Sequence, residues 1–426
     1  VATILEAREI ALVATGEHKA DIVRRAVEGD VHADVAATFL QQHPNARVHL
    51  DPAAAAGLTR VRTPWVVGDV GWTPRRELDA VLWLSGQTGK PILHLATNDY
   101  REHHLGSLAA RHGSAGPLNG RAFNELIAKI RGRSRLPSDE RVLVFSPHPD
   151  DGVVSMGGTR RKLVENGNDV TVAYQTSGNI AVFDHEVRRY LSFLAGVTEE
   201  LAVDPSGSFE ALEQRIDALL AAKQPGDVDS EEVQLFKRVI RETEAVAALE
   251  ATGLGRASAR FLDLPFYRTG AVEKRPISEV DIEPVLATLE ETRPSIVFAA
   301  GDLSDPHGTH RLCLQAVEEA LTRYDGPEPQ LWLYRGAWQE WPIAEATVLV
   351  PMSEDELRRK ILAIFRHQSQ KDVAPFPGPD PREFWQRVEA RNRETAEQLR
   401  RLGLPAYYAM EAFMTFERGR EVVAPR

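Results

Sequence analysis

The sequence contains a single cysteine, Cys313, among its 426 residues. One cysteine excludes an intrachain disulfide framework and a thiolate-rich zinc cluster. Any metal bound by this chain must therefore be held by histidine and carboxylate side chains. So low a cysteine content is also typical of proteins in a reducing compartment.

Long apolar runs and a basic excess are also missing. No apolar run approaches the roughly 20 residues that a membrane helix needs, and the opening VATILEAREI lacks the basic flank and apolar core of a signal peptide. Acidic residues outnumber basic ones by 62 to 51, so no surface for a phosphate backbone is expected. We predict a cytoplasmic protein that binds neither membranes nor nucleic acids. Because the chain begins at Val1 inside what reads as a domain, we also expect an N-terminal portion to precede it.

Two α/β units are predicted from the pattern of apolar runs. The first hundred residues alternate short β-rich runs with helical ones, which is typical of parallel α/β structure. Glycines and prolines then gather around one probable helix, which indicates a linker. The predicted organisation is a first unit over 1–112, a linker over 113–137 and a second unit over 138–426. Within the first unit the predicted strands are 9–15, 46–51, 63–70 and 90–96, and the predicted helices are 18–29 and 75–89.

The second unit restarts the strand–helix–strand pattern. Its predicted strands are 141–147, 169–176, 260–265, 294–302, 330–336 and 346–351, and its predicted helices lie near 157–167 and at 208–223, 231–252, 279–292, 354–371 and 382–402. Alternation of this kind predicts a Rossmann-like, mostly parallel sheet. No internal repeat or low-complexity tract interrupts it.

Two polar clusters follow buried strands of the second unit. The run His148-Pro149-Asp150-Asp151 comes directly after strand 141–147. Strand 294–302 is followed in the same way by a second cluster, which consists of Asp302, Asp305, His307 and His310. Ligand sites in open α/β sheets lie at the carboxyl ends of strands. The two clusters therefore share one pocket if their strands are neighbours.

A metal-dependent hydrolase can be built from these residues. His148, Asp151 and His310 form a set of two histidines and one carboxylate, which suits Zn²⁺ and also accepts Fe²⁺, Mn²⁺ or Co²⁺. Asp150 remains as a general base that takes a proton from the attacking water, and His307 would stabilise the oxyanion. The alternative is a helix N-cap, in which the Asp side chains accept backbone N–H groups at 153–155. A second cluster with His-x-x-His weighs against that alternative.

The same motifs resemble a known enzyme family. SPHPDD, then MGGT, and later DPHGTH look like the PIG-L/LmbE-like N-acetylglucosaminyl deacetylases, over about residues 138–420. The resemblance implies the same roles for the residues named above. It also implies that Arg241, in Arg241-Glu242-Thr243-Glu244, contacts substrate, unless this is only a solvated helical charge pair.

Further substrate contacts are predicted around these motifs. Arg268 stands where relatives that act in thiol pathways carry an Asp, and an Arg would suit a phosphate. Thr176, Ser177 and Asn179 follow strand 169–176 and are candidates for sugar-hydroxyl contacts, or else an ordinary polar turn. His367 ends a helix, where a histidine is favoured by the helix dipole; we prefer that account to a place in the pocket.

The N-terminal portion resembles a second family. ATGEHKA, AVEG and FLQQHP look like the last quarter of glucosamine-6-phosphate deaminase, over about residues 1–70. The resemblance implies that Lys19 binds a sugar phosphate, the alternative being an exposed lysine at a helix start. The catalytic Asp, His and Glu of that family fall in segments absent from this chain. Deaminase activity is therefore not expected from the chain alone, although the segment suggests a homo-oligomer by analogy with sugar isomerases.

Together the two resemblances predict a function. We expect zinc-dependent removal of the acetyl group from a small amino sugar, N-acetylglucosamine 6-phosphate, to feed a glucosamine-6-phosphate deaminase. Two alternatives remain open: a deacetylase of another N-acetylglucosamine conjugate, and a non-catalytic sugar-phosphate-binding module of a deaminase.

Overall fold

The structure is a computed structural model that describes residues 2–204, 206–224, 226–270, 274–301, 308–336, 339–370 and 382–416. Its strands are β1 (Ile10–Ala14), β2 (Ala46–Leu50), β3 (Arg141–Ser146), β4 (Asp169–Tyr174), β5 (Ala259–Phe261), β6 (Ile296–Ala300), β7 (Gln330–Tyr334), β8 (Val348–Met352) and β9 (Ala409–Phe416). Its helices are α1 (Ala2–Leu5), α2 (Ala20–Glu28), α3 (Pro52–Ala55), α4 (Thr59–Arg62), α5 (Pro74–Thr88), α6 (Thr97–Glu102), α7 (Gly106–Arg111), α8 (Ala115–Lys129), α9 (Asp151–Glu165), α10 (Asp184–Leu201), α11 (Ser208–Ala222), α12 (Glu231–Glu250), α13 (Glu279–Thr292), α14 (Thr309–Arg323), α15 (Glu354–Ile364) and α16 (Phe384–Arg401).

The main sheet is mostly parallel and has seven strands in the described part of the chain. Their order is β5-β4-β3-β6-β7-β9-β8. Every pair from β5 to β7 is parallel, and only β9 runs antiparallel to its neighbours β7 and β8. The predicted mixed α/β class with a mostly parallel sheet is confirmed.

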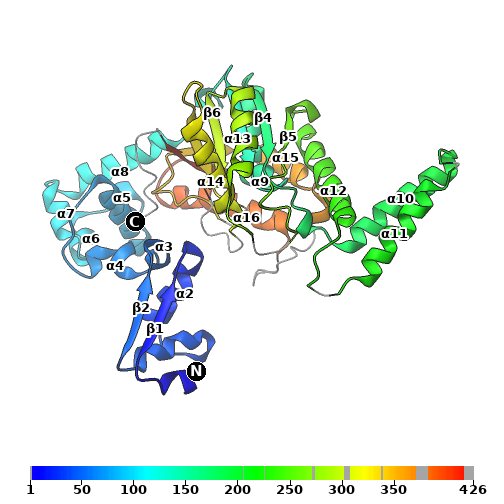
Figure 1. Cartoon of the computed structure of the whole chain (residues 1–426). Coiled ribbons are helices and arrows are strands. Elements are labelled where there is room, and N and C mark those ends of the chain that lie inside the picture. Colours follow the sequence, from blue (N-terminus) through cyan, green and yellow to red (C-terminus); the bar gives the residue numbers. More distant parts are fainter. Residues whose placement is uncertain are drawn as a thin grey trace.

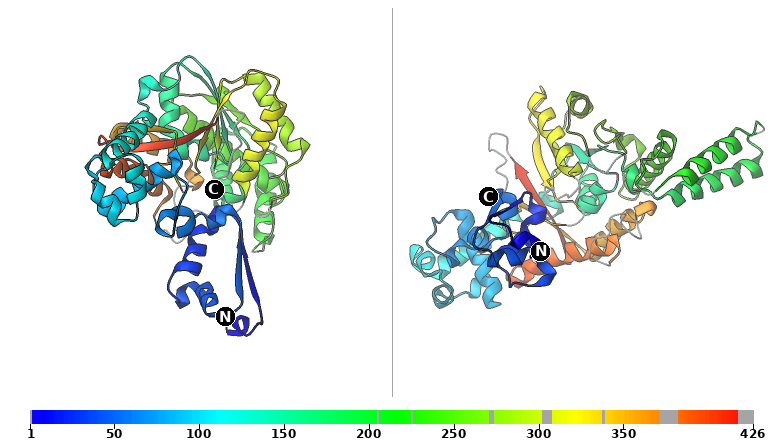
Figure 2. Two further views of the ribbon diagram at one scale, coloured as in Figure 1. Left: turned by 90° about the vertical axis from the view of Figure 1, so that its left-hand side faces the viewer. Right: turned by 60° about the horizontal axis from the view of Figure 1, so that its bottom comes forward.

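Helices cover both faces of this sheet (Figure 2). Successive strand residues point to opposite faces, so Leu143 and Val297 pack with α13 and α14 in one core cluster. Val142 and Ile296 point the other way and pack with α9 and α12. With both faces covered, β6 is apolar throughout and β3 is apolar from Val142 to Phe145, as buried parallel strands are.

The N-terminal residues form a small unit that projects from the main body (Figure 1). Strands β1 and β2 are parallel and pair with one another alone, from Ile10 opposite Ala46 to Ala14 opposite Leu50. Both strands match the predicted ranges. Arg335 Nη2, after β7, donates to Glu17 Oε2 at 3.0 Å and ties this unit to the main body.

Two other predicted strands of the first unit are wrong. Residues 63–70 contain a short 3-10 helix, η3 (Pro64–Val66), and residues 90–96 contain another, η4 (Ile92–His94). Pro64 and Pro91 each stand at the start of such a turn. Proline fixes φ and has no N–H to donate to a sheet, which disfavours strand pairing around Pro64 and Pro91.

Residues 113–137, predicted as a linker, are largely helical. Helix α8 occupies Ala115–Lys129, and its Leu118 and Leu126 are buried in the core cluster that also holds side chains of α13 and α14. Beyond it, the Arg131 N–H donates to the Leu349 carbonyl of β8 at 2.8 Å. This stretch therefore packs on the sheet, and the domain boundaries stay a prediction.

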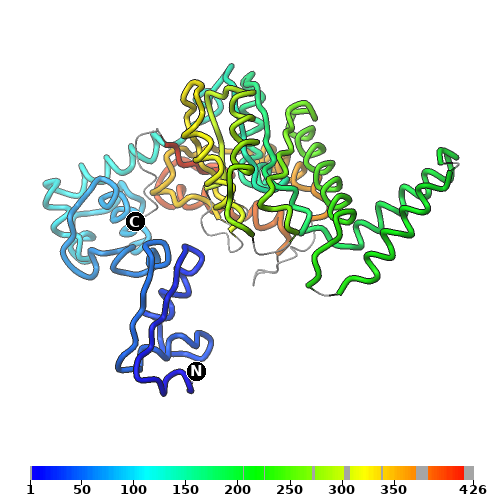
Figure 3. Tube along the Cα trace, viewed as in Figure 1, coloured from blue at the N-terminus to red at the C-terminus, as the bar shows by residue number. Residues whose placement is uncertain are grey.

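A helical hairpin extends from the opposite side of the main body (Figure 3). It consists of α10 and α11, and sequence analysis predicted α11 but not α10. Val187 and Leu191 of α10 pack on Ile216 and Leu220 of α11. Among the described residues, no helix is both long enough and apolar enough to cross a membrane.

Helix α9 is kinked by a buried carboxylate. The backbone departs from helical angles at Met156. Just after it, Glu411 of β9 accepts hydrogen bonds from the Gly158 N–H at 3.0 Å and the Thr159 N–H at 2.7 Å. Lys360 Nζ of α15 donates to the same carboxylate at 2.7 Å, and the Lys360 and Glu411 side chains are both fully buried. Strand β9 thus fixes the shape of the helix that follows the HPDD run.

Gly158→Ala should destabilise the fold, because a Cβ at this position would collide with the Met352 sulfur. Overpacking of this kind costs about 1–3 kcal/mol, which urea denaturation would measure. Gly86→Ala, at an exposed position of α5, is the matched control. No atom lies within 4 Å of its Cβ position, so the variant should gain up to about 1 kcal/mol. A Gly158→Ala protein as stable as the wild type would contradict this packing.

Candidate active site at the carboxyl ends of β3 and β6

Three predicted metal ligands converge where β3 and β6 end. His148 and Asp151 follow β3, and His310 lies in the first turn of α14, beyond β6. His148 Nδ1 lies 3.0 Å from Asp151 Oδ2, and His310 Nε2 lies 3.1 Å from the same oxygen. The two ring nitrogens are 3.3 Å apart. Strands β3 and β6 pair directly, and His310 of the second cluster lies beside His148 and Asp151 of the first.

These three side chains fit a divalent metal ion. One ligand atom from each lies within 4.8 Å of the others, and no other such group of histidine, cysteine or acidic residues occurs among the residues described. Two imidazole nitrogens and one carboxylate oxygen are the donor set of many catalytic zinc sites. Asp151 and His310 are buried, and the His148 side chain is 25% exposed, which leaves the site open on one side.

Asp151 carries a negative charge in this setting. Burial on its own would raise the pKa of Asp151. The positive charge of His310 and hydrogen bonds from His148 and His310 outweigh burial and hold the pKa well below its ordinary value. The His148 backbone N–H also donates to Asp151 Oδ2 at 2.8 Å. A carboxylate fixed in the ionised form is ready to ligate a cation.

Asp150 is held by an arginine and not by helix capping. It is the residue before α9, but its side chain makes no capping hydrogen bond, so the N-cap alternative for Asp150 is wrong. Instead Arg241 Nη2 of α12 donates to Asp150 Oδ1 at 2.6 Å. Both side chains are nearly buried. Such a charge-assisted bond orients the carboxylate beside the ligand set.

Arg241 was predicted to contact substrate, and the structure places it against the predicted base. Two of its nitrogens, Nε and Nη1, are buried without a hydrogen-bond partner among the described residues. Gly178 lies against the guanidinium: a Cβ there would be 3.1 Å from Arg241 Nε and 3.0 Å from Pro149. Gly178 also has a positive φ of 62°. Only glycine fits this close approach without strain.

The other predicted substrate residues differ in position. Thr176 is buried, and its hydroxyl donates to the Pro147 carbonyl at 2.7 Å, so it supports the loop before His148. Ser177 and Asn179 are buried nearby, and Asn179 Nδ2 donates to Gln234 Oε1 at 3.4 Å. Their contact with a sugar stays a prediction.

Arg268 and Lys19 lie at the surface. Arg268 Nε donates to the Asp263 carbonyl at 2.9 Å and to its carboxylate at 3.1 Å, and the Arg268 side chain is 58% exposed. Lys19 ends a short 3-10 helix before α2 and is exposed. Their phosphate-binding roles stay predictions. His307, the predicted oxyanion residue, lies outside the described residues, as do Asp302 and Asp305.

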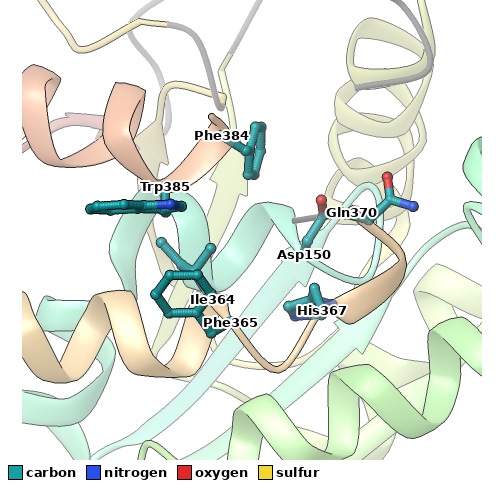
Figure 4. Close-up of a pocket in the computed structure, with 7 residues that line it drawn as sticks. All are labelled: Asp150, Ile364, Phe365, His367, Gln370, Phe384 and Trp385. Carbon is teal, nitrogen blue, oxygen red and sulfur yellow. The ribbon is translucent and has the colours of Figure 1, made fainter. Parts of the chain in front are cut away.

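A crevice too narrow to admit a water molecule lies beside Asp150 (Figure 4). Its walls come from the end of α15, the turn after it and the start of α16. They consist of Asp150, Ile364, Phe365, His367, Gln370, Phe384 and Trp385. Apart from Asp150, sequence analysis assigned none of these to the site, because contact across distant segments leaves no signal in a single sequence.

Tyr267 is a further neighbour that was not predicted. Its ring meets the His148 ring edge-on, with centroids 5.8 Å apart, and it is buried. Burial, its largest influence, raises the pKa of Tyr267 above the ordinary value. The phenol thus stays protonated and packs one side of a ligand histidine.

Comparison with known proteins identifies relatives of both parts of the chain. The family model described as PIG-L: GlcNAc-PI de-N-acetylase matches residues 143–321. A putative glucosamine-6-phosphate deaminase-like protein of Bacteroides thetaiotaomicron is 43% identical over 436 residues, which cover 98% of this chain and 66% of that protein. Glucosamine-6-phosphate deaminase of Rhodopirellula baltica is 57% identical over 60 residues, 14% of this chain and 24% of that one. This chain therefore spans less than two thirds of either relative.

Two solved structures also resemble the chain. A conserved protein of Thermus thermophilus has a TM-score of 0.40 at 19% identity, and the match covers 67% of this chain and 99% of that one. The A40926 pseudoaglycone deacetylase has a TM-score of 0.38 at 19% identity, covering 67% and 100%.

The family match falls within the second unit. Residues 143–321 are a PIG-L family domain. The N-terminal part of the chain is homologous to glucosamine-6-phosphate deaminase. Both predicted resemblances are thereby confirmed.

Loss of a ligand should lower metal binding. We expect His148→Ala and His310→Ala to release zinc on dialysis against a weak chelator, because each removes one of three donors. Asp150→Asn should retain it, because Asp150 is not among the converging ligands. Elemental analysis of the dialysed proteins measures the zinc bound per chain. The control is His103→Ala, which lies just after α6 and is remote from the site. Equal zinc in wild type and His148→Ala would refute this ligand set.

Breaking the Arg241–Asp150 pair should destabilise the protein strongly. Arg241→Met leaves a nearly buried carboxylate without its partner, which costs about 3–5 kcal/mol. Arg238→Met, on the same helix, removes a surface pair with Asp263 and should cost under about 1 kcal/mol. Chemical denaturation measures the free energy of unfolding of both variants. Similar decreases in the two variants would show that the buried pair contributes no more to stability than the pair with Asp263.

Proposed function

We propose that this protein hydrolyses the N-acetyl amide of an amino sugar, and that its substrate is N-acetylglucosamine 6-phosphate. The observation that supports this most directly is the convergence of His148, Asp151 and His310 within 4.8 Å, with Asp150 immediately beside them. The PIG-L family domain and the deaminase homology of the N-terminal part support the substrate class.

Deacetylation requires a proton to move from water to nitrogen. Water forms a C–O bond to the acyl carbon, the C–N bond breaks, and the products are acetate and a free amine. A divalent ion, Zn²⁺ in our proposal, would polarise the amide carbonyl and acidify the attacking water when bound. Asp150 would hold the transferred proton. Arg241 donates a hydrogen bond to Asp150 Oδ1, so we assign the proton to Oδ2.

The other residues orient and enclose the substrate in this proposal. His148, Asp151 and His310 hold the metal, while Arg241 keeps the Asp150 carboxylate facing the acyl carbon. Ser177 and Asn179, buried near the loop before His148, are the sugar-hydroxyl contacts in this proposal. His307 keeps its predicted role at the oxyanion.

The product explains the association with a deaminase-like segment. Deacetylation of N-acetylglucosamine 6-phosphate gives glucosamine 6-phosphate, the compound after which the relatives' deaminase is named. A deacetylase joined to such a segment would release its product beside the enzyme that consumes it.

A second candidate function is deacetylation of another N-acetylglucosamine conjugate. The family description names GlcNAc-PI, and Arg268, our candidate for the sugar phosphate, already donates to Asp263. An arginine partly satisfied by a neighbouring carboxylate offers less to a phosphate. This observation favours a substrate without a 6-phosphate.

Acetate release tests the proposal. The zinc-loaded protein should release acetate from N-acetylglucosamine 6-phosphate faster than from N-acetylglucosamine or an N-acetylglucosaminyl inositol. Asp150→Asn should slow turnover by about 10²–10⁴-fold, the usual contribution of a general base, with zinc retained. Faster release from the inositol conjugate would favour the second candidate. Zinc binding without release from any of the three would indicate a non-catalytic binding module.

A further inference from the structure

The metal ligands come from separate elements, so neither element alone sets the distances between them. His148 and Asp151 belong to the loop after β3 and the first turn of α9, whereas His310 belongs to α14. Three donor atoms within 4.8 Å of one another suit a metal ion only while those distances are kept. The position of α14 relative to the end of β3 is therefore critical for the site.

The apolar contacts of α14 do not fix this position closely. Leu314 and Val317 pack in the core cluster between the helix and the sheet. Apolar contacts are non-directional, and packed helices can slide on them by small amounts. A hydrogen bond has a narrow range of length and angle. A buried hydrogen bond to the backbone of α14 would therefore hold the helix more exactly than packing does.

Gln175, which follows β4, makes such a bond. Its side-chain Nε2 donates to the Cys313 carbonyl of α14 at 2.9 Å. Gln175 is 1% exposed and Cys313 is fully buried, so water does not compete for the bond. Cys313 stands almost one helical turn after His310. The bond therefore holds the part of α14 that carries the ligand.

The backbone of Gln175 is bound to the end of β3 at the same time. Its N–H donates to the Ser146 carbonyl at 2.8 Å, and Ser146 lies just before His148 in the chain. On its other side, the Gln175 carbonyl accepts a hydrogen bond from the Leu264 N–H at 2.8 Å. One buried residue thus joins the segment before His148 to the helix that carries His310.

We propose that Gln175 is a positioning residue that sets the distance of His310 from His148 and Asp151, and thereby the affinity of the metal site. Gln175 neither ligates the metal nor contacts substrate. This inference rests on the metal site of the proposed function, but it concerns binding of the ion and requires no turnover.

Gln175→Met tests the assignment. Methionine is of similar length and has no donor, so the substitution removes the bond to α14 and leaves the backbone bonds of residue 175. The Cys313 carbonyl keeps its partner within the helix, so the Tm should fall by only a few degrees. Zinc affinity, measured by competition with a chromophoric chelator, should fall about tenfold, the lower end of the effect of losing a residue that orients metal ligands.

The spectrum of bound Co²⁺ reports the geometry of the site directly. At saturating Co²⁺, the visible absorption of Gln175→Met should differ from that of the wild type, because His310 meets the ion at a different position. Gln175→Leu, which is also apolar but shorter, is the second variant and should show the same changes.

Asn119→Leu is the matched control. Asn119 is buried in α8, remote from the metal ligands, and its Nδ2 donates to the Leu95 carbonyl at 2.8 Å. The variant removes a buried bond from a side-chain amide to a backbone carbonyl, which is the same kind of bond. It should lower the Tm at least as much as Gln175→Met and leave the zinc affinity and the Co²⁺ spectrum unchanged.

Wild-type zinc affinity in both Gln175 variants would overturn the assignment. An equal loss of affinity in Asn119→Leu would also overturn it, because the effect would then be general destabilisation. Absence of zinc binding by the wild type would overturn it together with the ligand set. Zinc binding without acetate release would refute the proposed reaction alone, and the affinities of the variants would still decide the role of Gln175.

Discussion

The direct pairing of β3 with β6 is the constraint on which the site depends. Val142 lies opposite Ile296 and Val144 opposite Phe298, so both strands end at the same edge of the sheet. The loop after β3 supplies His148 and Asp151, and α14 after β6 supplies His310. Parallel strands require long crossovers between them, and this one runs from β4 to α13, with room for the hairpin and for α12. The three predicted metal ligands come from the two strand ends, and the inserted segment adds Arg241, which binds Asp150.

The carboxyl ends of β3 and β6 were predictable because each apolar run is followed by a cluster of polar residues. Helix α13 was predicted at its observed bounds, and α11, α12 and α16 within two residues. Strand β9 escaped prediction because Ala409, Met410 and Glu411 favour helices, and a carboxylate in a strand centre argues against burial. Lys360 and Thr159 supply the partners of Glu411 from segments far away in sequence. Helix α10 escaped because Phe193 and Leu201 are 64% and 65% exposed and blur the helical periodicity.

Paired charges organise the interior on both sides of α9. Asp150 and Arg241 lie before its first turn, and Glu411 and Lys360 lie beside its kink. Buried pairs are weak sources of net stability, since desolvation offsets their attraction. Their geometry is nevertheless demanding, because each carboxylate must meet a specific donor. The helix that leads out of the HPDD run is thereby held at its start and at its kink. The direction of the predicted base is set by packing outside the metal-ligand set.

The position of β9 bears on how the protein is made. This strand lies between β7 and β8 although it follows both in the chain. Until β9 has been synthesised, β7 is an edge strand of the sheet. During the same period β8 has no strand in the sheet with which to pair. The Gly158 N–H cannot bond to Glu411 until that residue, 253 positions further along the chain, has been synthesised. The loop after β3 is thus among the earlier parts of the second unit to be synthesised and among the last to reach its final shape. A chain released before β9 is made would lack the Glu411 contacts to α9 and would leave an unpaired strand prone to association.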